Sequence, residues 1–137
     1  MKKTTIALTF IVLMLVPLRI FSLNGWFTMT YPEPIRPFES VFKAVCEVES
    51  NSNPLAYNPE ENAVGIAQIR QIRVDDYNQR TGSNVQLDDC FNTEISKMIF
   101  MYYAERYGFG RIDDCIRSWN GSGSATYEYL KKVKQLI

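Results

Sequence analysis

The sequence predicts an all-α protein that folds as one compact domain of five or six helices. Apolar residues recur with the 3.6-residue spacing of helices in several segments, and no segment shows the sustained alternation of a strand. The chain of 137 residues is long enough for one sizeable core but not for two domains. A hydrophobic content of 46% is that of an ordinary globular protein.

Residues 1–22 precede the predicted domain and have the order of a secretory signal. Lys2 and Lys3 come first, an apolar run extends from Thr5 to Leu18, and Arg19 follows it. The run is shorter than the roughly 20 residues that a membrane-spanning helix needs. We therefore expect an exported protein of the periplasm or cell envelope, with the signal either cleaved or kept as an uncleaved N-terminal anchor.

A proline-rich leader, residues 23–37, joins this signal to a domain that we expect to span residues 38–137. Without residues 1–22 the chain has 12 basic and 15 acidic residues, a net charge of −3. A mildly acidic domain without a basic stripe binds nucleic acid poorly, so no nucleic-acid partner is expected.

The first helix is predicted from about Phe38 to Ser50, where apolar residues follow one face. A loop rich in Asn and Pro follows over residues 51–62. Residues 63–80 have an apolar pattern that predicts one or two short helices, ended by Gly82.

Three further helices are predicted in the second half of the chain. Asn92 or Thr93 caps a long helix that ends near residue 107, and another helix spans about residues 112–119. The last helix begins after Ser124. Its apolar side is expected to comprise Tyr127, Leu130, Val133 and Ile137.

Three cysteines leave at least one thiol without an intramolecular partner. Cys90 and Cys115 both lie near predicted helix starts, and they either form a disulfide with each other or remain free. Cys46 lies on the apolar face of the first helix and is expected to be buried. With no histidine and no CxxC pair in the chain, we expect no zinc site, no other metal and no cofactor.

Glu49 lies at the end of the first predicted helix and in line with its apolar stripe. Glu47, two positions earlier, is rotated by about 200° and faces solvent. Burial and the negative end of the helix both raise the pKa of a carboxyl group, which suits it to act as an acid. The simpler interpretation is a glutamate exposed at a fraying helix end.

Several short segments around Glu49 and downstream of it share their order and spacing with one family. From about Val41 to Leu136 the chain resembles the soluble lytic transglycosylase domain, which is related to goose-type lysozyme. The matching residues are Glu49, Ser50, Pro54, Ala56, Ala63, Gly65, Ile66, Ala67, Gln68, Trp119 and Asn120.

The resemblance implies a compact lysozyme-like domain with a substrate cleft, and peptidoglycan glycan strands as the substrate. It implies cleavage of the β-1,4 bond between N-acetylmuramic acid (MurNAc) and N-acetylglucosamine (GlcNAc). Glu49 matches the family's catalytic acid, which acts first as an acid and then as a base to form a 1,6-anhydro sugar. A second carboxylate is not needed, unlike in the usual glycosidase pair.

The resemblance also implies substrate-binding residues. Ser50 braces the helix end, Gln68 is the cleft glutamine, and Trp119 with Asn120 replaces the family's Tyr-Asn pair. Asn58 stands where the family often has Ser, and Ala67 stands where it usually has Met. A further candidate comes from the aromatic residues of the long helix: either Tyr102 or Tyr103 lines the cleft, or both are core aromatics.

The sequence is also compatible with two other functions. A hydrolase of the goose-lysozyme kind would use water and a base, for which the candidates are Asp75, Asp76, Glu60 and Glu61. The alternative is a non-catalytic peptidoglycan-binding or assembly protein. We expect a monomer, acting in wall turnover, with an envelope-spanning secretion or conjugation apparatus, or in a phage-derived role.

Overall fold

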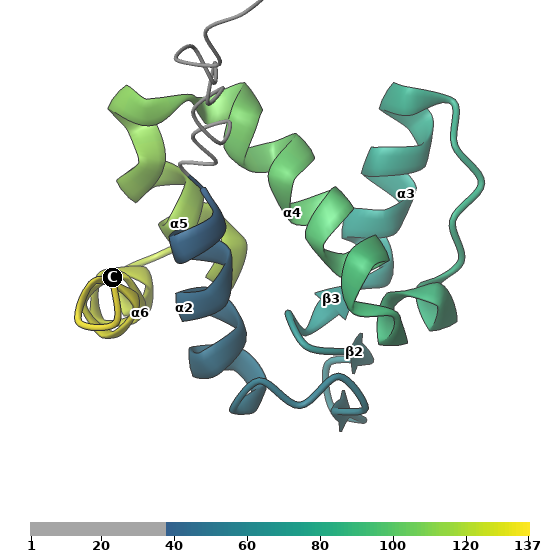
Figure 1. Ribbon diagram of the computed structural model, residues 1–137, viewed down its shortest axis with the longest axis horizontal. Helices are drawn as coiled ribbons and strands as arrows, with labels where there is room; N and C mark the ends of the chain where they lie inside the picture. The colour runs from purple at the N-terminus through teal and green to yellow at the C-terminus, as the bar shows by residue number, and fades with distance from the viewer. Residues whose placement is uncertain (1–37) are drawn as a thin grey trace, which may run out of the picture. The chain divides into compact units, whose positions relative to one another are not determined.

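The computed structural model describes residues 38–137, which form a mainly helical domain with a small three-stranded sheet (Figure 1). The five α-helices in this range are α2 (Glu39–Ser50), α3 (Gln71–Thr81), α4 (Thr93–Tyr107), α5 (Ile112–Asn120) and α6 (Ala125–Lys134). The strands are β1 (Tyr57–Asn58), β2 (Ala63–Val64) and β3 (Ile69–Arg70), and the 3₁₀ turns are η1 (Leu87–Phe91) and η2 (Phe109–Arg111). The predicted all-α class is confirmed, with the sheet as an addition.

The long helix predicted in the centre of the chain is confirmed as α4, with both of its caps. The side chain of Asn92 accepts a hydrogen bond from the Glu94 backbone N–H at 2.9 Å, and Gly108 ends α4. Helix α4 packs against α2 and α5 on one side and against α3 on the other (Figure 1). It therefore forms the centre of the domain.

Residues 63–70 are not helical, and this part of the prediction was wrong. Antiparallel pairing joins Asn58 to Ala63 and Ala63 to Arg70, so three two-residue strands lie side by side. Gly65 and Gln68 both have positive φ, 76° and 47°, which turns the chain back between the second and third strands. An apolar run this short does not distinguish a helix from a strand by its periodicity.

The buried face of α6 also differs from the prediction. Tyr127 and Ile137 are each 58% exposed, whereas the residues buried on α6 are Thr126, Tyr129 and Val133. The guanidinium carbon of Arg117 lies 3.8 Å from the centre of the Tyr127 ring, which explains how this aromatic is accommodated at the surface.

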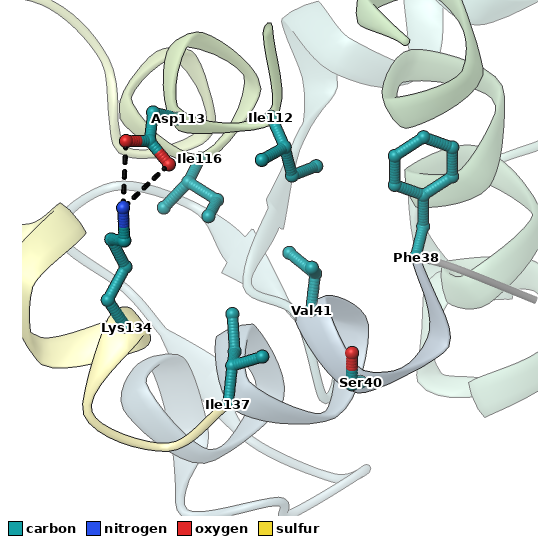
Figure 2. Close-up of a pocket in the computed structure, with 8 residues that line it drawn as sticks. All are labelled: Phe38, Ser40, Val41, Ile112, Asp113, Ile116, Lys134 and Ile137. Carbon is teal, nitrogen blue, oxygen red and sulfur yellow. Dashed lines mark hydrogen bonds and ion pairs between the residues drawn. The ribbon is translucent and has the colours of Figure 1, made fainter. Parts of the chain in front are cut away.

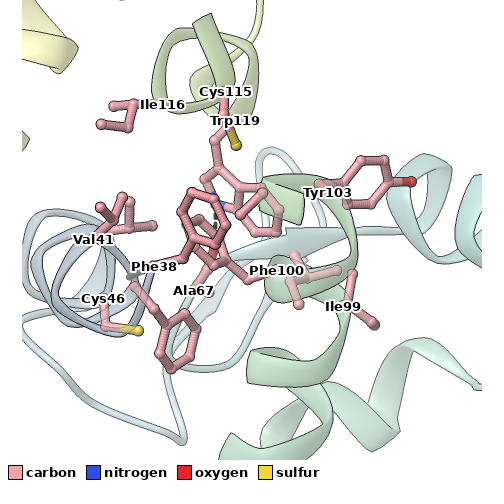
Figure 3. Packing of buried hydrophobic residues seen from close by; sticks show 14 of the residues in the cluster. Phe38, Val41, Cys46, Ala67, Ile99, Phe100, Tyr103, Cys115, Ile116 and Trp119 are labelled. Carbon is pink, nitrogen blue, oxygen red and sulfur yellow. Dashed lines mark hydrogen bonds between the residues drawn. The ribbon is translucent and has the colours of Figure 1, made fainter. Parts of the chain in front are cut away.

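The core gathers between α2, α4 and α5. Figure 3 shows the rings of Phe38, Phe100 and Trp119 together at this place. The Phe100 ring centre lies 5.0 Å from that of Trp119 and 5.3 Å from that of Phe42. Such tilted aromatic contacts add to the stabilisation that comes from burial alone.

Cys46, Cys90 and Cys115 are all buried and free, so the disulfide considered for the last two is absent. The predicted signal and leader lie outside the described residues. Within residues 38–137, the structure has no helix with the length and apolar character needed to cross a membrane.

Candidate active site

Glu49 is the penultimate residue of α2, at the end of the helix that leads toward the sheet. The helix stops because Asn51 adopts a left-handed conformation with φ of 52°, and its N–H donates to the Glu47 carbonyl at 3.0 Å. Glu47 is exposed and Glu49 is half-buried, as helical phase predicted. The carboxyl group of Glu49 therefore faces the domain and not bulk solvent.

Tyr129 of α6 is the direct partner of this carboxyl group. Its hydroxyl donates a 2.7 Å hydrogen bond to Oε1 of Glu49, and the tyrosine is only 7% exposed. The sequence prediction placed Val133 correctly but missed Tyr129, because it put Tyr127 on the buried side of α6. The spacing of Tyr129 from Thr126 and Val133, three and four residues apart, is the signal that identifies the correct face.

The pKa of Glu49 is raised above its ordinary value, chiefly because burial disfavours the charged form. The hydrogen bond from Tyr129 opposes this rise, since it stabilises the carboxylate. The negative charge of Glu61 raises the pKa of Glu49, and the positive charge of Arg70 lowers it. Burial and the carboxyl group also raise the pKa of Tyr129, which stays a hydrogen-bond donor.

Ser50 ties the end of α2 to the turn between β2 and β3. Its hydroxyl lies 2.7 Å from the Ile66 carbonyl, to which it donates, and it accepts from the Asn53 N–H at 3.1 Å. The bracing role expected for Ser50 therefore has a specific partner. It holds residues 65–68 against the helix end that carries Glu49.

Gly65 holds the same turn in place from the other side. Its N–H donates to the Ala56 carbonyl at 2.8 Å, and a Cβ at this position would lie 2.0 Å from the Cys90 carbonyl oxygen. Only glycine fits so close to a neighbouring backbone at a φ of 76°. Gln68 closes the turn, and its side-chain amide donates to the Gly65 carbonyl at 3.0 Å.

Trp119 links α5 to this turn. Its indole N–H donates to the Ala67 carbonyl at 3.1 Å, and its side chain is 6% exposed. Trp119 thus fixes the backbone next to Gln68 from within the core. A contact of Trp119 with a sugar stays a prediction.

The other candidates lie at separate places. Asn120 is exposed at the end of α5. Asn58 is half-buried in β1, where its side chain accepts from the Glu60 N–H at 3.0 Å. Tyr102 packs its ring edge-on against those of Tyr77 and Tyr103, 5.2 Å and 5.3 Å away. The substrate roles of these residues, and the cleft itself, stay predictions.

The four carboxylates considered as a hydrolytic base differ in their surroundings. Asp76 accepts hydrogen bonds from Tyr103 and Arg80, and the first of these is the main cause of its lowered pKa. Asp75 is exposed and accepts from Gln71. Glu60 and Glu61 are exposed as well. Of the four, only Glu61 contributes to the pKa shift of Glu49.

A separate pocket of about 350 Å³ lies at the opposite end of α2, where Phe38 and Val41 face α5 and the chain end (Figure 2). Its lining is largely apolar, and an ion pair between Lys134 and Asp113 lies at one side. Glu49 lies at the other end of the helix, nearly its full length away.

Fold and site together define a small, mainly helical domain with one half-buried glutamate held by a tyrosine. The chain matches the transglycosylase SLT domain over residues 36–136, and it belongs to this family. The resemblance seen in the sequence is thereby confirmed. Members of the family are generally lytic transglycosylases, which degrade peptidoglycan. No curated protein and no solved structure matches the chain.

Proposed function

We propose that this protein is a lytic transglycosylase that cleaves the MurNAc–GlcNAc β-1,4 bond of peptidoglycan with Glu49 as its only acid–base group. The observation that carries the proposal is the hydrogen bond from Tyr129 to the half-buried Glu49 in a domain of this family. Burial favours the protonated form of Glu49, and the tyrosine hydroxyl supports the anion that follows.

In the first step, protonated Glu49 donates its proton to the glycosidic oxygen as the bond from this oxygen to the MurNAc anomeric carbon breaks. Because Tyr129 donates to Oε1, the other carboxyl oxygen, Oε2, is the one placed to carry the proton. The positive charge that develops on the sugar is next to the newly formed carboxylate, which stabilises it.

In the second step, the Glu49 carboxylate takes the proton of the muramoyl 6-hydroxyl, and that oxygen bonds to the anomeric carbon. The product is a 1,6-anhydro sugar, and Glu49 is protonated again. The overall reaction therefore needs neither water nor a second carboxylate, in contrast to paired-carboxylate hydrolysis.

Gln68 and Asn120 are proposed to bind the sugars. The side-chain nitrogen of Gln68 is used by the Gly65 carbonyl, and within residues 38–137 no donor contacts its Oε1. This oxygen is thus suited to accept from an N-acetyl N–H or a hydroxyl. Asn120 is exposed beside Trp119 and offers an amide of the same kind.

The substitution Glu49→Gln tests the catalytic assignment. It keeps the shape of the side chain and an oxygen for the Tyr129 hydroxyl but removes the transferable proton, so lysis of purified cell-wall sacculi should fall at least about 1,000-fold. Glu47→Gln is the matched control on the same helix and should lyse at the wild-type rate. Equal lysis by wild type and Glu49→Gln would exclude Glu49 as the acid, and no lysis by either would favour the binding-protein alternative.

A hydrolase is the second candidate, and the proximity of Glu61 to Glu49 is the observation that favours it. In that reaction Glu61 would activate water as the base. Glu61 is, however, exposed to solvent at the surface, where it forms an ion pair with Arg70 at 3.6 Å. The two reactions leave different sugar ends, anhydro for the first and reducing for the second.

We further propose that residues 1–22 export the protein to the periplasm or cell envelope, where its substrate lies. The basic start and short apolar run of this segment support the proposal. Fractionation of cells that express the full chain tests it, with mass spectrometry of the mature N-terminus to separate a cleaved signal from an anchor. A monomeric state and a role with a secretion or conjugation apparatus stay predictions.

A further inference from the structure

A small hollow beside Gln68 brings two arginines together. It has a volume of about 20 Å³, and its lining comprises Gln68, Ile69, Arg70, Ile72, Arg73 and Trp119. This is room for about one water-sized group, such as a single carboxylate oxygen. The arginines come from β3 and from the first turn of α3.

Arg73 supplies a positive charge that is held firmly in place. Its guanidinium carbon lies 4.5 Å from the Tyr103 ring centre and 4.8 Å from that of Trp119. One of its nitrogens donates to the Ser118 carbonyl at 3.0 Å. The two rings and the Ser118 carbonyl together hold the guanidinium of Arg73, which also lines the hollow.

Arg70 is held only loosely. Its nearest carboxylate is that of Glu61, at 3.6 Å, which is longer than the roughly 2.8 Å of a charge-assisted hydrogen bond. The two side chains are 37% and 58% exposed, and such surface ion pairs contribute little. A ligand carboxylate that meets Arg70 with two parallel hydrogen bonds would therefore displace Glu61.

Peptidoglycan presents carboxylates of this kind, because its MurNAc residues carry short peptides with free carboxyl groups. The predicted mature chain has a net charge of −3, so it repels these groups unless positive charge is gathered locally. The hollow adjoins Gln68, the residue proposed above to bind the sugars. A stem peptide on a bound glycan is thus brought close to both arginines.

We propose that Arg70, supported by the fixed charge of Arg73, binds a free carboxylate of the peptidoglycan stem peptide. The proposal rests on the function proposed above, since it needs the glycan at Gln68. This contact makes the protein bind glycan strands that carry peptides more tightly than strands from which the peptides have been removed.

Calorimetric binding to the Glu49→Gln protein tests this, because that variant is expected to bind substrate without consuming it. The ligands are a soluble glycan fragment with its stem peptides, the same fragment with the peptide carboxylates converted to amides, and the fragment without peptides. The intact peptides should increase the affinity about tenfold over the other two ligands. Adding Arg70→Gln should remove this increase, whereas Arg111→Gln, at an exposed arginine of η2, should keep it.

An equal loss of affinity for all three ligands on Arg70→Gln would overturn the proposal, as would an unchanged preference for the peptide carboxylates. The amide ligand tests the same contact without altering the protein, so a folding defect in the variant does not obscure the result. Ligand binding is also measured separately from cleavage of the substrate. A wild-type protein that forms no anhydro ends would refute the proposed function while the binding data still decide the role of Arg70.

Discussion

At the scale of single residues, the site combines two opposing effects on one carboxyl group. Burial raises the pKa of Glu49, and the Tyr129 hydroxyl lowers it again while staying protonated itself. A single acid–base group needs both, because it must hold a proton before the bond breaks and remain a stable anion until the second proton transfer. Tyr129 thus supports the proposed chemistry of the glutamate that it contacts.

Tyr129→Phe should shift the alkaline limb of the pH–rate profile to higher pH. Loss of the hydrogen bond that lowers the Glu49 pKa lets that pKa rise further, so the protonated acid persists to higher pH. The maximal rate should fall by about 10- to 100-fold, because the carboxylate intermediate loses its donor. Lysis of sacculi measured across pH checks both effects.

Tyr127→Phe is the control for this experiment, since Tyr127 lies on the same helix but is 58% exposed. Its profile should match that of the wild type. An unmoved limb, or a shift toward lower pH, in Tyr129→Phe would contradict the role assigned to the hydrogen bond.

At the scale of elements, the sequence was most informative where local signals determine the structure. The periodicity of α2 and the caps of α4 are contained within a few residues, and both helices were predicted correctly. The segment from Ala63 to Arg70 was not, because its conformation depends on partners distant in sequence. Ser50 and Trp119 hold its carbonyls from 16 and 52 residues away.

The buried side of α6 was predicted only in part, for a related reason: Val133 is buried as predicted, but Tyr127 is exposed. Tyr127 belongs to a more apolar stripe than Tyr129, and periodicity alone favours the wrong face. Tyr129 packs in the core and contacts the carboxyl group of Glu49, 80 residues earlier in the chain, a partner that local periodicity does not reveal. The inward position of Glu49 on α2 was thus predictable from the sequence, whereas its tyrosine partner required the structure.

Gly65→Ala should destabilise the domain by about 3 kcal/mol or more. The new Cβ would clash with the Cys90 carbonyl oxygen, and the positive φ of this position is unfavourable for alanine. Gly82 has nearly the same φ, 73° against 76°, but nothing lies within 4 Å of its Cβ position. Gly82→Ala should therefore cost only about 1–2 kcal/mol. Denaturant unfolding of both variants gives the comparison, and equal losses would show that close packing at Gly65 is unimportant.

At the scale of the whole molecule, the family match spans residues 36–136 and accounts for nearly all of the described chain. Within it, Ser50 of α2 and Trp119 of α5 both donate hydrogen bonds to the turn at residues 65–68 between β2 and β3. The fold thus serves to bring one helix end, one turn and one buried tyrosine together. It does so without a disulfide among the three cysteines.

The thiols should report on the integrity of this fold. Burial raises the pKa of Cys46 to about 12 and those of Cys90 and Cys115 to about 11, so none forms an appreciable thiolate at neutral pH. Reaction with a thiol reagent should be very slow in the native protein and should give three thiols per chain in denaturant without reductant. A count of one thiol in denaturant would reveal a disulfide and contradict the structure.

The most direct test of the central claim is the analysis of sugar ends after digestion of purified peptidoglycan. Mass spectrometry of the products should find 1,6-anhydro-MurNAc ends with the wild-type protein and none above background with Glu49→Gln. Reducing MurNAc ends alone would show that water is the nucleophile, and the single-carboxylate mechanism would then be wrong.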